Sequence, residues 1–342
     1  MNPLRALPAL SESRARVAAA AVTLPVVAVS AVAWASPASA ATVVNVSTAA
    51  QLTSALANAA PGTSIVLADG TYTGQFVGAK SAPFSNPIKI TGTRRAVLTT
   101  GSTSTGTALS IGGAQWRLTG FTVTKALNGI EVSHSWGTVI DKVEVGTIGQ
   151  KGIRLQGNSS EAVVQRSYVH DTGLTNARYG EGIDVGSSVD NWAAVTAGKP
   201  DRTNKVRVLG NRIERTAAEG VDVKEGTIGG TISANTFLDA GVVGWNSGDS
   251  WVDLKGNGWR VVSNTGAGAQ DDAMQIHSIA GLDGKQIPGS GDDNVVRGNT
   301  VTGGVPGYLI KVYKNSDNNT IGCDNVRTDD GDKGISNRKC TP

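Results

Sequence analysis

The sequence predicts an all-β protein, a right-handed parallel β-helix with an N-terminal capping helix. The first observation is that one extended segment, Ala218–Gly226 (AEGVDVKEG), recurs in degenerate form along the chain. Side chains of a strand alternate between its two faces, so Asp222 and Lys224 would point outward and the valines inward. Six further copies begin at Gly129, Gly152, Gly182, Trp251, Ala273 and Gly307. A constant scaffold with a variable outer face is typical of a solenoid.

A second repeated segment supports the same fold class. It has the form apolar-x-x-Asn-x-apolar and follows the strands of the first type. Its copies are Leu209–Ile213, Ile232–Phe237, Val262–Thr265, Val296–Val301 and Ile321–Val326. Stacked asparagines at one turn can bond each other's amides and the local backbone, and Asn tolerates the left-handed conformation of such a turn. The period of roughly 20 to 40 residues, with Gly, Asn and Thr turns, indicates coils of parallel strands.

Residues 1–40 have the features of a secretory signal peptide. Three arginines precede an apolar run from Val17 to Ala35, and Ala38–Ala40 (ASA) is a small-residue cleavage site. A membrane anchor is the competing interpretation, but Pro25 interrupts the run. The two arginines at 14 and 16 are separated by an alanine, so they do not form a twin-arginine signal, and the export route stays open. We therefore expect a secreted, extracellular protein.

Export to an oxidising compartment determines how the two cysteines are interpreted. Cys323 and Cys340 are the only two cysteines and both lie near the C-terminus, where an oxidising compartment would let them form a disulfide over the last coil. Without residues 1–40 the chain has 28 basic and 27 acidic residues. This near-neutral balance does not predict a nucleic-acid-binding face. We expect no membrane partner, and a monomer.

The mature chain, residues 41–342, is expected to form one β-helix domain. Asn45–Asn58 places leucines and alanines on one helical face, with Ser47 or Thr48 as the N-cap, and Pro61-Gly62 ends the helix. Such a helix would cover the open end of the solenoid. Strands follow, and the regular repeat begins at Asn128. Three insertions are too long to be coil turns and should rim a binding face: Thr172–Gly180, Ser187–Asn204 and Gly281–Asp293.

Alignment of the repeats predicts two columns of outward side chains, because neighbouring strands lie about 4.8 Å apart. The first column reads Glu131, Arg154, Asp184, Asp222, Asp253, Gln275 and Leu309. The second reads Ser133, Gln156, Gly186, Lys224, Lys255, His277 and Lys311. Three residues before the first column, Glu181 and Glu219 also align, with Asp249 close by.

Stacked carboxylates need compensating cations. Two like charges about 5 Å apart repel by roughly 3 kcal/mol at an effective dielectric constant near 20. The lysines supply part of the positive charge, and a hard divalent ion, calcium, would suit a carboxylate cluster of this density. The competing interpretation is that Asp222 with Lys224 and Asp253 with Lys255 are charge pairs that keep the sheet face solvated.

Three further residue types bear on the site. His277 is a candidate catalytic residue through its place in the second column. Asp271-Asp272 reads as a turn or as a carboxylate pair for hydrolysis. Several tryptophans lie near the insertions, and Trp192 could stack on a sugar or pack locally. We expect Arg154, Trp192 and Lys311 to bind substrate.

The glycine-rich coils, the Asn ladder, the N-terminal helix followed by Leu67–Tyr72 (LADGTY), and the Asp/Lys columns resemble the pectate-lyase superfamily of right-handed β-helices. The resemblance covers essentially the whole mature chain. The fold hosts lyases, hydrolases, esterases and adhesins, so it does not fix the activity.

The resemblance implies a calcium-dependent lyase acting on an acidic, uronate-containing, pectin-like polysaccharide. In this chemistry a cation neutralises the uronate carboxylate, a lysine removes the C5 proton, and the glycosidic oxygen leaves. By position, Lys224 or Lys255 would be the base, with His277 as a further catalytic candidate. The implied calcium ligands are Glu181, Asp184, Glu219, Asp222 and Asp253.

Two alternatives remain open at the sequence level. The signature blocks of the most familiar pectate lyases are absent, as are the Asn-Thr-Asp and Gly-His-Gly motifs of polygalacturonases. Asp271-Asp272, His277 and Ile310-Lys311 nevertheless occur in a loosely similar order, which keeps a glycoside hydrolase as an alternative. The other alternative is a non-catalytic carbohydrate-binding β-helix. The sequence also leaves open whether neighbouring cations or aspartates dominate the pKa of the lysines.

Overall fold

The computed structural model describes residues 42–244, 248–281, 287, 290–329 and 331–342. The predicted signal peptide at residues 1–40 lies outside these residues, as does Trp245. Ser39–Pro342 forms one compact unit. Within the described residues, no helix has the length and apolar character needed to cross a membrane.

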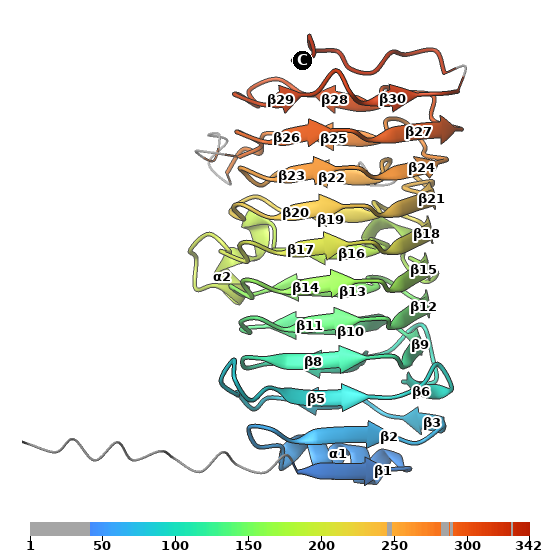
Figure 1. Cartoon of the computed structure of the whole chain (residues 1–342), viewed down its shortest axis with the longest axis vertical. Helices are drawn as coiled ribbons and strands as arrows, with labels where there is room; N and C mark the ends of the chain where they lie inside the picture. The colour runs from blue at the N-terminus through green and yellow to red at the C-terminus, as the bar shows by residue number, and fades with distance from the viewer. Residues whose placement is uncertain (1–41, 245–247, 282–286, 288–289, 330) are drawn as a thin grey trace, which may run out of the picture. The chain divides into compact units, whose positions relative to one another are not determined.

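The unit is a parallel β-helix of three sheets, as the sequence predicts, with each coil adding one strand to each sheet (Figure 1). Sheet A contains β1 Val43–Val46, β2 Ser64–Leu67, β5 Ile88–Thr91, β8 Trp116–Thr119, β11 Val139–Asp141, β14 Val163–Gln165, β17 Arg207–Leu209, β20 Thr231–Ser233, β23 Arg260–Val262, β26 Val295–Arg297 and β29 Thr320–Ile321. Sheet B contains β3 Gly70–Thr73, β6 Ala96–Thr99, β9 Thr122–Ala126, β12 Glu144–Ile148, β15 Tyr168–Thr172, β18 Arg212–Thr216, β21 Thr236–Ala240, β24 Thr265–Ala267, β27 Thr300–Gly303 and β30 Val326–Arg327. Sheet C contains β4 Phe76–Gly78, β7 Thr107–Ile111, β10 Asn128–Ser133, β13 Ile153–Gln156, β16 Ile183–Val185, β19 Val221–Val223, β22 Val252–Leu254, β25 Met274–Ile276 and β28 Ile310–Val312.

The helix α1, Ala49–Ala57, caps the N-terminal end of the coils (Figure 1). The side chain of Thr48 accepts a hydrogen bond from the backbone N–H of Gln51, so the N-cap is Thr48. The helix buries Leu52, Ala55 and Leu56. These contacts cover the first coil, and the predicted capping helix is confirmed.

The asparagine ladder is also confirmed. Asn211, Asn235, Asn264, Asn299 and Asn325 stack at the turn from sheet A to sheet B, and each of the first four side-chain amides donates to the next side-chain oxygen at 2.9–3.0 Å. Each of the first four also donates to a backbone carbonyl near 2.9 Å. The side chains thereby satisfy buried backbone groups that the turn would otherwise leave unpaired.

The interior consists of apolar side chains that point inward from all three sheets, with Trp116, Trp251 and Trp259 fully buried among them. The tryptophans near the acidic coils therefore include core residues. Near the C-terminus, Cys323 and Cys340 form the predicted disulfide.

The register of sheet C corrects one predicted alignment. Gln275 pairs with Lys311, so Lys311 and not Leu309 occupies the first column. Leu309 is fully buried. The segment Tyr308–Ile310 has three apolar residues in succession, and apolar alternation therefore could not set the frame of this strand.

Candidate active site

The predicted columns meet on the outward face of sheet C, over the five consecutive strands β13, β16, β19, β22 and β25. They form the floor of a cavity of about 740 Å³. One wall is the insertion after β16, which contains the short helices η2 (Val189–Asn191) and α2 (Trp192–Val195). Opposite it, Arg178 and Tyr179 come from the insertion before β16, which contains η1 (Ala177–Tyr179). Two of the three predicted insertions thus rim the site, as expected from their length; most of the third, Gly281–Asp293, lies outside the described residues.

Three aspartates lie side by side on the floor. Asp184 pairs with Asp222 across β16 and β19, and Asp222 pairs with Asp253 across β19 and β22. Each is at most 2% exposed. Buried carboxylates at this spacing are stable only with positive charge beside them.

Two lysines supply that charge. Lys224 bonds Asp222 and lies 3.7 Å from Glu181 and 3.8 Å from Asp184, all measured from its Nζ to a carboxylate oxygen. The Nζ of Lys255 lies 2.6 Å from Asp222 and 2.7 Å from Asp253. Both oxygens of Asp222 therefore accept from an ammonium group.

A third lysine was not identified from the sequence. The Nζ of Lys151 lies 2.5 Å from Glu181 and 3.1 Å from Asp184, and its side chain is 10% exposed. Lys151 stands three residues before Arg154, just as Glu181 and Glu219 stand three residues before Asp184 and Asp222. Extending that alignment back by one coil would have found it.

The carboxylates decide the protonation of the two lysines. Burial alone lowers the pKa of Lys224 and Lys255, but the nearby negative charge, that of Asp222 above all, outweighs burial and raises both pKa values. Reciprocally, the lysines overcome the effect of burial on Asp222 and hold the pKa of its carboxyl far below the ordinary value. Glu219 differs, because burial and then the charge of Asp222 raise its pKa well above the ordinary value.

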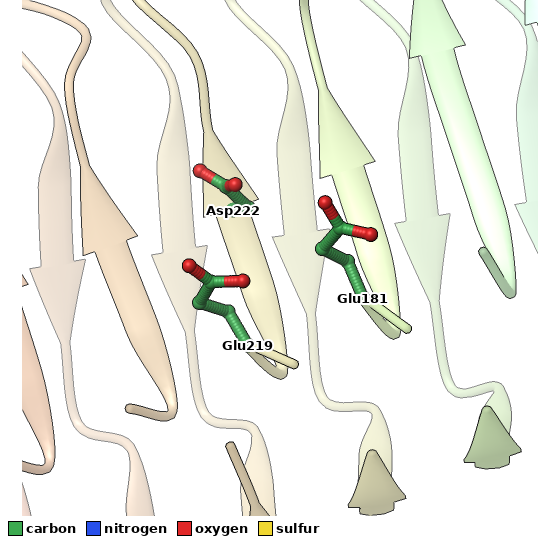
Figure 2. Close-up of side chains that lie close together, drawn as sticks. All are labelled: Glu181, Glu219 and Asp222. Carbon is green, nitrogen blue, oxygen red and sulfur yellow. The ribbon is translucent and has the colours of Figure 1, made fainter. Parts of the chain in front are cut away.

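Three of the five predicted metal ligands gather in one place. Figure 2 shows Glu181, Glu219 and Asp222 close together, and one oxygen from each lies within 4.8 Å of the others. Calcium binds oxygen ligands at 2.3–2.6 Å, so this spacing and this donor chemistry fit the ion. The Oε2 atom of Glu181 is buried and, among the described residues, has no hydrogen-bond partner. Lys224 and Lys255 already bond Asp222, so their ammonium groups compete with a metal ion for this carboxylate.

The other two predicted metal ligands, Asp184 and Asp253, form ion pairs with basic side chains instead. Asp184 lies beside Lys151, and also beside Arg154, whose Nε is 3.5 Å away. Asp253 accepts from Lys255 and faces His277, with 2.7 Å between the Nδ1 of His277 and the Oδ1 of Asp253. Both aspartates thus act as partners of basic groups.

His277 lies at the C-terminal end of the cavity. Its ring stacks on that of Tyr313, with 3.9 Å between centroids, and its side chain is 19% exposed. Because Asp253 faces Nδ1, the hydrogen-bond network assigns the proton to Nδ1 and leaves Nε2 as an acceptor.

The three predicted substrate-binding residues are not together. Arg154 lines the cavity. Lys311 lies two strands beyond Asp253, with its Nζ 5.0 Å from the ring centroid of Tyr308 and 5.8 Å from that of Tyr313. Trp192 is 7% exposed and donates its indole N–H to the carbonyl of Ser187 at 2.9 Å. Its ring packs inside the insertion, so the expected sugar-stacking role of Trp192 is corrected to local packing.

No protein-family model and no curated protein matches the chain. Among solved structures, an alginate lyase from Paenibacillus sp. str. FPU-7 is 32% identical, with a TM-score of 0.76, and the match covers 86% of this chain and 99% of that one. The chain is a parallel β-helix polysaccharide lyase. Two more distant structures share the lyase's fold: pectate lyase Pel9A, at 16% identity, TM-score 0.57 and coverage of 77% and 73%, and tailspike protein 2 of bacteriophage CBA120, at 12%, 0.56 and coverage of 82% and 40%.

The family fixes the class of reaction that the chain catalyses. A lyase needs a group that removes a proton and a group that protonates the leaving oxygen. The floor of the lyase's cavity holds an imidazole and two ammonium groups within one cluster of carboxylates. Membership of this family favours a lyase over the two alternatives that the sequence left open, a glycoside hydrolase and a non-catalytic carbohydrate-binding protein.

Proposed function

We propose that the chain is a secreted lyase that cleaves a uronate-containing polysaccharide by β-elimination. The observation that carries this proposal is the cluster of Lys224, Lys255 and His277 on one cavity floor. The 32% identical alginate lyase supports a polyuronate as substrate. The disulfide between Cys323 and Cys340 supports an extracellular location, since such bonds persist in oxidising compartments.

We assign the removal of the C5 proton to His277, although the sequence favoured a lysine. The carboxylates raise the pKa of both lysines, so at neutral pH neither is a free amine that could accept the C5 proton. Each is an ammonium group that gives up its proton only to a strong base such as a departing alkoxide. A neutral imidazole offers one ring nitrogen as a proton acceptor while the other donates, and Asp253 orients that of His277. The Nε2 of His277 is therefore the acceptor that the cluster offers.

The two lysines would act on the leaving group and on the charge of the site. When the C5 proton leaves, its electron pair forms the C4–C5 double bond and the C4–O bond breaks, so the departing oxygen needs a proton. Lys255 lies between Asp253, which orients His277, and Asp222. We assign proton donation to Lys255, and Lys224 balances the charge of Glu181, Asp184 and Asp222.

Calcium is the proposed cofactor, and Glu181, Glu219 and Asp222 are its proposed ligands. When bound, it would neutralise the uronate carboxylate and make the C5 proton more acidic. Arg154, at the other end of the cavity, is assigned to a second uronate carboxylate, because a guanidinium group bonds carboxylates well.

The test uses the mature protein with sodium alginate and polygalacturonate, with calcium or with a chelator. Product is followed both as ultraviolet absorbance of unsaturated uronate and as reducing ends. We expect both signals to rise together, and the chelator to reduce them. Loss of a general acid or base typically costs 10²–10⁴-fold, so His277→Gln and Lys255→Met should each fall in that range. Lys89→Met, an exposed lysine on sheet A, is the control.

Reducing ends without ultraviolet absorbance would contradict the lyase proposal. Full activity of His277→Gln, together with loss in Lys255→Met, would return the base to a lysine. Activity that the chelator leaves unchanged would show that the lysines alone supply the positive charge.

A further inference from the structure

The two ends of the cavity differ in charge. The N-terminal end is lined by Lys151, Arg154 and Arg178. Beyond the C-terminal end, Asp249, Asp271 and Asp272 gather around Gln275, whose amide donates to Asp249 at 2.8 Å and to Asp272 at 3.3 Å. A polyanion is attracted to the first end and repelled from the second. This difference favours placing the rest of a long polyuronate over the N-terminal coils.

The turns from sheet C to sheet A form a continuous ridge on that side. The backbone N–H of Ala82 donates to Ala114 at 3.1 Å, and that of Gln115 donates to Trp136 at 2.8 Å. The ridge continues into the cavity wall, because the N–H of Gly137 donates to Ser160 at 2.9 Å and the turn of Ser160 contacts the insertion after β16.

Two aromatic residues are exposed on this ridge. Trp136 is 45% exposed in the turn after β10, and Phe84 is 74% exposed in the turn after β4. The turn between them contains Gly112, Gly113 and Ala114, none of which carries a large side chain. The two turns are two coils apart, a rise of about 10 Å.

Packing does not account for this exposure. Tryptophan is normally largely buried, as Trp116 is in the same coil as Ala114, and exposed apolar groups rimmed by polar residues commonly mark binding surfaces. The C–H face of a pyranose ring packs on an aromatic ring as other apolar surfaces do. The insertion beside the ridge is fixed, because the Nε2 of His134 lies 3.2 Å from the carbonyl of Val195.

We propose that Trp136 and Phe84 form an accessory surface on which sugar rings of the uronate polymer stack after it leaves the N-terminal end of the cavity. This inference rests on the proposed function and extends it from the reacting residues to the remote part of the substrate. It makes the enzyme prefer long chains, because a short oligosaccharide held in the cavity does not reach the ridge.

The test compares Trp136→Ala, Phe84→Ala and the double variant on long-chain sodium alginate and on its trisaccharide. We expect KM for the polymer to rise about tenfold in the double variant, a change that corresponds to about 1.4 kcal/mol. The kcat on the polymer, and kcat/KM on the trisaccharide, should not change. Trp136→Phe should retain most of the affinity. Val326→Ala, with 46% exposure at the other end of the coils, is the control.

Electrophoresis in gels that contain alginate gives a readout without catalysis. Retardation of the wild-type protein should decrease in the double variant and remain in the control. An unchanged KM and unchanged retardation in the double variant would overturn the inference, as would an equal loss on trisaccharide and polymer. Absence of unsaturated product from the wild type would instead refute the proposed function, whatever the gels show.

Discussion

Replacing Asp272 by Asn should stabilise the protein at neutral pH and leave it unchanged in acid. Asp272 is 2% exposed, and its Oδ1 accepts from the backbone N–H of Tyr308 at 2.5 Å. Burial above all, with the charge of Asp271, raises the pKa of its carboxyl from 3.8 to about 6, against the backbone hydrogen bond from Tyr308 and the charge of Lys311. The variant keeps the carbonyl acceptor and removes the charge.

The magnitude follows from the pKa. Each unit of difference between the folded and unfolded pKa corresponds to about 1.4 kcal/mol, so a rise of about two units destabilises the folded protein by about 3 kcal/mol once the carboxyl is ionised. For an acid whose folded pKa is raised, this destabilisation is complete above the folded pKa, near 6, and disappears as the pH falls to the unfolded pKa of 3.8. The variant should therefore gain up to about 3 kcal/mol at pH 7.5 and nothing near pH 4.

The assay is urea unfolding of wild type and Asp272→Asn at pH 7.5 and pH 4. The variant gives up only the 3.3 Å hydrogen bond from the Gln275 amide, which keeps its 2.8 Å bond to Asp249. Asp332→Asn, at an exposed aspartate, is the control and should change the free energy of unfolding by about 0.5 kcal/mol or less. Equal free energies for wild type and Asp272→Asn at both pH values would refute the reasoning.

Two further predictions concern stability. Asn264→Ala removes the acceptor of Asn235 and two donations, to Asn299 and to the carbonyl of Ile232. Because these groups are buried, the free energy of unfolding in urea should fall by about 3 kcal/mol, and a loss below 0.5 kcal/mol would show that the ladder is not needed. Asp171→Asn tests acid stability: hydrogen bonds from Arg215 above all lower the pKa of Asp171 to about 2. This stabilisation is present above pH 3.8 and is lost as the pH falls through 2, so the variant should be less stable by about 1 kcal/mol at pH 6 and equal to wild type near pH 2. A deficit that persists at pH 2 would contradict that origin.

The fold could be predicted because its repeats can be recognised directly in the amino-acid sequence. Alternation in Gly182–Gly186 and Ala218–Gly226 places Asp184 and Asp222 outward, and the strands are parallel, so the sequence aligns their columns correctly. The same rule failed at Leu309, where successive apolar residues hide the frame. Local pattern therefore determines register wherever alternation is unbroken.

The site was less predictable because it depends on distances between columns. The sequence grouped five carboxylates, but among the described residues the three that gather at the spacing of metal ligands, with one oxygen each within 4.8 Å, are Glu181, Glu219 and Asp222. The protonation of the lysines follows from two ion pairs at one carboxylate, Asp222, which no spacing reveals. The burial of Trp192 depends on how its insertion folds back on itself.

The most direct test of the account is the absorbance of unsaturated uronate during digestion of sodium alginate by the wild type, Lys255→Met and His277→Gln. The account predicts a rise with the wild type that falls by 10²–10⁴-fold in each variant while the folded state persists. Depolymerisation by the wild type without that absorbance, or undiminished absorbance in both variants, would contradict lyase chemistry at this cluster.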